Sequence, residues 1–154
     1  MSGLAILLPV AIPAAALGAC LLVPDRARKA KELIAVLAAA ATLVAAALVF
    51  GREERLSYAW VPEWGFNLSF RLYGFSSFII LAASGFALAA CLYSWSFMEG
   101  KGRLRRYFAF LLITLAQVNG AALADNLAVM LFFWEGLLLT LYGIDVGIKY
   151  NKLN

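Results

Sequence analysis

Five long apolar segments divide this chain, and they restrict its fold more than any other feature. They cover about residues 3–23, 33–50, 74–98, 107–124 and 127–144. Each is close to the roughly 20 residues that an α-helix needs to cross the ~30 Å hydrocarbon layer of a bilayer. Since lipid offers no hydrogen bonds to exposed backbone, each crossing segment is expected to be helical. The pattern predicts an all-α integral membrane protein, a single membrane unit over residues 1–154 with a polar tail at 145–154.

The composition agrees with a membrane protein and argues against several functional classes. Charged residues make up 14% of the chain, against about 25% in a typical soluble domain. The chain has no histidine, and Cys20 and Cys91 lie inside apolar segments, so we expect buried thiols and no metal, haem or iron–sulfur cluster. No Gly-x-Gly-x-x-Gly motif follows a strand, so no cofactor is expected. The basic residues form short clusters without a nucleic-acid-binding motif, so nucleic acid is not an expected partner.

The distribution of basic residues predicts how the chain lies in the membrane. Most of the 13 lysines and arginines lie near residues 28 and 103 or in the C-terminal tail. They are Arg26, Arg28, Lys29, Lys31, Lys101, Arg103, Arg105, Arg106, Lys149 and Lys152. The others, Arg52, Arg55 and Arg71, lie between the second and third segments. Because cytoplasmic loops carry the excess of basic residues, we expect the N-terminus outside and the C-terminus in the cytoplasm, in the cell inner (plasma) membrane.

The stretch between the second and third apolar segments has a different periodicity. Residues 56–60 and 66–72 alternate apolar and polar side chains, and the turn-like sequence Val-Pro-Glu-Trp-Gly at 61–65 separates them. Alternation with a period of two is typical of half-buried strands. The sequence therefore predicts a short β-hairpin at the outer membrane face, with an irregular amphipathic loop as the alternative.

A single carboxylate, Glu135, interrupts the fifth apolar segment. A helix that starts after Asp125 carries Glu135 about 15 Å along its axis, which is near the bilayer midplane. A carboxylate at this depth costs several kcal/mol unless a partner or water compensates, so it indicates a function. Its neighbours one turn away are apolar, so its partner must come from another helix, from water or from another chain.

Polar residues of the fourth segment lie near the predicted depth of Glu135. Asp125 and Asn126 are suited to a tight turn that caps the fifth helix, so the fourth and fifth helices should be antiparallel neighbours. Gln117 then lies about as deep as Glu135, and Asn119 lies closer to the surface. Desolvation favours a protonated glutamate and a nearby cation favours an ionised one, so a balanced group can relay protons. We predict a proton path through Glu135, Gln117 and Asn119, or alternatively a protonated, purely structural Glu135.

Several short stretches of the chain resemble a known family. They are Arg-Leu-Tyr-Gly-Phe-Ser at 71–76, Leu-Tyr-Ser-Trp-Ser-Phe-Met at 92–98, Arg-Arg-Tyr-Phe-Ala at 105–109, Ala-Asp-Asn-Leu at 124–127 and Phe-Trp-Glu-Gly at 133–136. They are similar to the N-terminal five-helix portion of the antiporter-like proton-pumping membrane subunits. These occur in NADH–quinone oxidoreductase (chains of the L, M and N type), membrane-bound hydrogenase, formate hydrogenlyase and multisubunit sodium–proton antiporters. The resemblance covers residues 1–144 and is strongest over 71–144.

The resemblance implies a proton path and a set of partners. The glutamate that matches Glu135 would pair with a lysine on a seventh helix, in subunits of about fourteen helices built from inverted repeats. Tyr73 stands where the family usually has an acidic residue, and residues 143–154 do not look like a sixth helix. The expected partners are other membrane subunits, among them a chain supplying the later helices and their lysines, unless the sequence is truncated. Redox chemistry would belong to other subunits.

The leading functional hypothesis is a proton-translocating, antiporter-like subunit, or the N-terminal part of one. It would work in a redox-driven respiratory or hydrogenase complex and carry no redox chemistry itself. A non-pumping structural or assembly subunit of such a complex is one alternative. An unrelated small transporter that acts as an oligomer is another.

Overall fold

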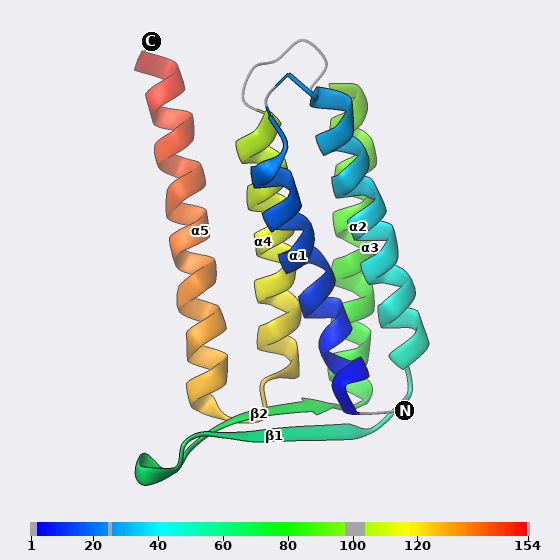
Figure 1. Ribbon diagram of the computed structural model, residues 1–154, viewed down its shortest axis with the longest axis vertical. Coiled ribbons are helices and arrows are strands. Elements are labelled where there is room, and N and C mark those ends of the chain that lie inside the picture. The colour runs from blue at the N-terminus through cyan, green and yellow to red at the C-terminus, as the bar shows by residue number, and fades with distance from the viewer. Residues whose placement is uncertain (1–2, 25, 98–103, 154) are drawn as a thin grey trace.

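The computed structural model describes residues 3–24, 26–97 and 104–153. Their helices run up and down side by side, and a β-hairpin crosses one end of them (Figure 1). The elements in order are η1 (Gly3–Leu7), α1 (Leu8–Leu22), α2 (Arg28–Val49), β1 (Glu54–Val61), η2 (Pro62–Trp64), β2 (Phe66–Leu72), α3 (Gly74–Phe97), α4 (Leu104–Leu123) and α5 (Leu127–Leu153). The predicted fold class is confirmed, including the hairpin between the second and third helices.

Hydropathy supports membrane crossing to different degrees along the chain. Within the described residues, Gly3–Leu22, Lys29–Val49 and Gly74–Phe97 are long and apolar enough to span a bilayer. Shorter apolar stretches occupy Tyr107–Leu123 of α4 and Leu127–Gly143 of α5. The chain is therefore embedded in a membrane by its apolar helices.

Three helices extend beyond their predicted ends, among them α4, which begins at Leu104 rather than at residue 107. α2 begins at Arg28, ahead of residue 33, and α5 continues to Leu153, through most of the expected polar tail. Hydropathy reports where a helix prefers lipid, but it does not report where backbone hydrogen bonding stops. No proline follows Leu127, and an internal glycine costs a helix only about 1 kcal/mol, so α5 can continue after its apolar stretch ends.

The hairpin closes one end of the helical bundle. β1 and β2 pair antiparallel, with Leu56 opposite Phe70, and the register shifts between Ala59 and Val61. Gly65 ends the turn in the left-handed conformation, φ +68°, which glycine adopts without strain. The side chains of Leu56 and Phe70 pack against the bundle core, so the predicted alternation does place one apolar face inward.

The core of the bundle consists of two clusters, one toward each end. The cluster at the hairpin end contains Ile6, Ala46, Val49, Leu72, Ile80 and Leu123. The other contains Cys20, Ala35, Ala38, Ala39, Cys91, Phe108 and Leu112. Both draw on alanines of α2, and small residues let membrane helices approach closely. α1 to α4 therefore form the packed unit, while α5 packs chiefly on α4 and β2.

Candidate functional site

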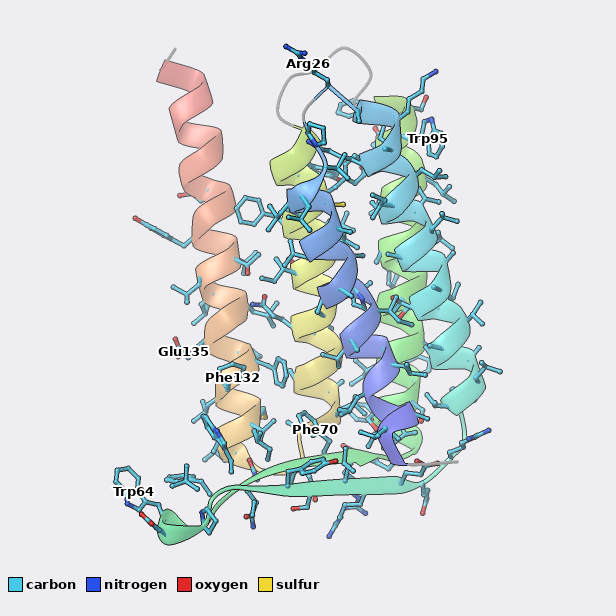
Figure 2. The ribbon with its side chains drawn as sticks, in the orientation of Figure 1. Arg26, Trp64, Phe70, Trp95, Phe132 and Glu135 are labelled. Carbon is cyan, nitrogen blue, oxygen red and sulfur yellow. The ribbon has the colours of Figure 1, made fainter. Side chains whose placement is uncertain are left out.

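Glu135 lies on the side of α5 that faces away from the rest of the chain. Residues at helical spacing, namely Val129, Phe133, Gly136, Thr140 and Gly143, form the less exposed side of α5 that faces α4. Glu135 is exposed, and Figure 2 shows its side chain pointing away from α4. Within the described residues its carboxylate makes no hydrogen bond or ion pair.

The surface around Glu135 is almost entirely apolar. Its large side chains include Leu127, Leu131, Trp134, Leu138, Leu141 and Tyr142, all of them exposed. On the flank, Leu139 is 72% exposed. We call this surface the outer face of α5. A single carboxylate surrounded by such side chains is unfavourable in lipid, and it becomes stable when protonated or when a polar partner approaches.

Gln117 faces α5 but not Glu135. The hydroxyl of Thr140 lies 2.9 Å from Gln117 Oε1, to which it can donate a hydrogen bond, and also 2.9 Å from the carbonyl oxygen of Gly136. The missing side chain at Gly136 makes room, because a Cβ there would lie 2.5 Å from Gln117 Nε2. Gln117 therefore forms an interhelical link between α4 and α5, on the other side of α5 from Glu135.

Asn119 faces a third helix, α1. Pro13 lies inside α1 and has no backbone N–H, so the carbonyl of Pro9 lacks its usual donor four residues later. Asn119 Nδ2 donates to that carbonyl at 2.8 Å, and Asn119 is fully buried. Its Oδ1 is buried without a partner among the described residues. Of the three predicted path residues, Asn119 points toward α1, Gln117 points toward α5, and Glu135 points away from the bundle.

The turn between α4 and α5 is fixed to the hairpin. Asn126 Oδ1 accepts a hydrogen bond from the N–H of Val129 at 2.8 Å, which caps the start of α5, and Asn126 Nδ2 donates to the carbonyl of Asn67 at 2.7 Å. Asp125 does not cap the helix through its side chain. Its Oδ2 lies 3.1 Å from Nε of Arg55, and its N–H donates to the carbonyl of Ser69 at 2.9 Å.

Sequence reasoning missed the residues that Gln117 and Asp125 contact. Thr140 could have been found, because it lies in a helical series of small residues, Gly136, Thr140 and Gly143, that is typical of helix contacts in membranes. Arg55 left no such signal, since its position beside Asp125 depends on how the hairpin crosses the bundle. Within the described residues, no group of three or more cysteine, aspartate or glutamate side chains could hold a metal ion. Cys20 and Cys91 are buried and form no disulfide.

Comparisons with known proteins agree with part of the resemblance. No protein-family model matches the chain. The chain is similar to the Na(+)/H(+) antiporter subunit A1 of Staphylococcus aureus strains JH9, Newman and JH1, in each case with 29% identity over 76 residues. The match covers 49% of this chain and 10% of each relative. Together with the apolar helices, this similarity supports an antiporter-like membrane protein.

Proposed function

We propose that the chain is an antiporter-like subunit, or the N-terminal part of one, that moves protons across the membrane through Glu135. The observation that carries this proposal is the position of Glu135. It is a carboxylate on an exposed apolar surface, roughly 12 Å along the helix from Leu127. The similarity to an antiporter subunit supports the same class of function.

The outer face of α5 is where the missing partner of Glu135 would act. A charged side chain facing lipid at mid-depth costs a few kcal/mol, so we infer that further polypeptide covers this surface in the assembled complex. A cation carried by that polypeptide would favour the ionised carboxylate when the two groups are close. When the cation moves away, the carboxylate would take up a proton. Later helices of a longer subunit, or helices of another chain, would supply the cation.

We assign different roles to Gln117 and Asn119. The link from Gln117 to Thr140 engages Gln117 Oε1, and the bond from Asn119 to Pro9 engages Asn119 Nδ2. In this proposal these two residues hold α4 against α5 and α1, and they affect transport by positioning α5. Glu135 is then the group that carries the proton.

The proposed complex could be driven by redox chemistry or by a sodium gradient, and an experiment can distinguish the two. The resemblance favours a redox-driven respiratory or hydrogenase complex, whereas the relatives carry the name of a sodium–proton antiporter. Vesicles that contain the assembled complex would acidify on addition of NADH or hydrogen in the first setting. In the second they would exchange protons against an imposed sodium gradient.

We also propose the orientation that the basic residues indicate, with the hairpin outside and the C-terminus in the cytoplasm.

The variant that tests the proposal is Glu135→Gln, which keeps size and hydrogen bonding but removes titration. We expect normal assembly and a large loss of proton transport. Glu63→Gln is the matched control, because Glu63 lies exposed in the hairpin turn and should leave transport unchanged. Proton transport at the wild-type rate in the Glu135→Gln complex would refute a relay through Glu135 and favour a structural or assembly role.

A further inference from the structure

A second surface feature, separate from Glu135 and α5, is formed by the N-terminal residues and α2. An open apolar groove runs between the N-terminal residues of the bundle and the second half of α2, with a volume of about 530 Å³. Its lining includes Ala5 and Leu8 on one side and Ala41, Ala45 and Arg52 on the other. The contacts that build the candidate site do not involve these residues.

The shape of the groove follows from its side chains. Ala41 and Ala45 lie one helical turn apart on α2, and their small side chains leave a hollow floor. The walls of the groove include the exposed side chains of Leu8, Val44 and Leu48. An open apolar groove with exposed aliphatic walls can hold a flexible hydrocarbon chain.

The length of the groove matches half a bilayer. From Ala41 to the end of α2 at Val49 the helix rises about 12 Å, and Arg52 follows within a few ångströms after a turn at Gly51, φ +75°. This length is about half of the ~30 Å hydrocarbon layer. A transmembrane helix would need a contact surface through both leaflets, whereas an acyl chain needs a contact surface in only one leaflet.

The charge at the end of the groove favours an anionic headgroup. Among the described residues that line the groove, Arg52 alone is charged, and it follows the end of α2 at Val49. α2 ends beside the hairpin, where a membrane surface would be (Figure 1). Glu53 and Glu54 follow Arg52 in the chain but do not line the groove. A guanidinium group can donate two parallel hydrogen bonds to a phosphate.

We propose that this groove binds one phospholipid from the leaflet at the hairpin end, with an acyl chain over Ala41 and Ala45 and the phosphate on Arg52. A net anionic headgroup is favoured over a zwitterionic one, because no positive group of the lipid then opposes the arginine. The bound lipid would extend the contact between the start of α1 and the end of α2.

Lipid retention on the purified chain tests the headgroup. The chain is extracted in detergent and incubated with phosphatidylglycerol or phosphatidylcholine of identical acyl chains, and bound lipid is counted by native mass spectrometry. We expect phosphatidylglycerol to be retained about fivefold better, the factor that one basic residue near an anionic lipid surface contributes. Arg52→Gln should bring the ratio close to one. Arg26→Gln, at the opposite end of α1 and α2, should leave it unchanged. Equal retention of both lipids by the wild-type chain would overturn the proposal.

A second pair of variants tests the acyl chain. Ala41 is exposed, so Ala41→Phe fills the groove without entering the core, and it should lower retention of both lipids. Ala47→Phe is the matched control, because Ala47 is exposed on the same helix but does not line the groove. Unchanged lipid retention in Ala41→Phe, with loss of a co-purifying membrane protein, would show that the groove takes a helix and would refute lipid binding.

Discussion

Asn119 Nδ2 lies 2.8 Å from the carbonyl oxygen of Pro9, the acceptor that Pro13 leaves without a backbone donor. A side chain of α4 thus completes the backbone hydrogen bonding of α1, although the two residues are 110 positions apart in sequence. In a membrane this matters more than in water, because lipid cannot supply the missing donor.

The first prediction concerns this pair. Asn119→Ala leaves the Pro9 carbonyl buried without a donor and should cost about 1–3 kcal/mol of unfolding free energy. In a Pro13→Ala background, the new N–H at residue 13 can donate to the same carbonyl, so Asn119→Ala should cost less there. Denaturant unfolding in detergent of the four chains gives the coupling. The same cost in both backgrounds would show that Asn119 stabilises the bundle in some other way.

The second prediction concerns the contact between α4 and α5. A Cβ at Gly120 would overlap the ring of Phe133, so Gly120→Ala should force α5 away and cost about 1–3 kcal/mol. Gly85→Ala is the control, because a Cβ there meets nothing within 4 Å, and alanine favours helix by up to about 1 kcal/mol. Thermal stability in detergent compares them. Equal melting temperatures for the two variants would contradict the close packing of Phe133 on α4.

The third prediction ranks two contacts of the turn between α4 and α5. Asn126→Ala removes both the cap of α5 and the bond to Asn67, and it should cost about 1 kcal/mol or more. Arg55→Gln removes an ion pair in which Arg55 is 61% exposed, and it should cost well under 1 kcal/mol. Chemical unfolding at low and high salt measures both effects. A larger loss for Arg55→Gln than for Asn126→Ala would reverse this ranking.

The fourth prediction concerns orientation in the membrane. Cys20 and Cys91 are buried, so the unmodified chain should react little with a membrane-impermeant thiol reagent. Ser57→Cys, on the exposed side of the hairpin, should be labelled from outside intact cells, and Arg26→Cys should be labelled only after the cells are opened. Labelling of the Arg26→Cys chain in intact cells would invert the orientation.

The sequence was sufficient to predict the helices, from the length of their apolar segments, and the hairpin, from its period of two. It was not sufficient to predict which way Glu135 faces. Helical spacing shows which residues share a side of α5, but not which side meets α4, since that depends on the packing of Gly136 and Thr140 against Gln117. The turn at Asn126 was predictable because capping is local, whereas the ion pair of Asp125 with Arg55 depends on long-range placement of the hairpin.

The attachment of α5 has a mechanical consequence. Its base is bound to β2 through Asp125 and Asn126, and above that point its main helical neighbour is α4. Any tilt of α5 would therefore pivot at the hairpin. Over its 27 residues α5 is about 40 Å long, and Glu135 lies about 12 Å from the pivot. A tilt that carries Glu135 by about 1 Å would sweep the far end of α5 by about 3 Å.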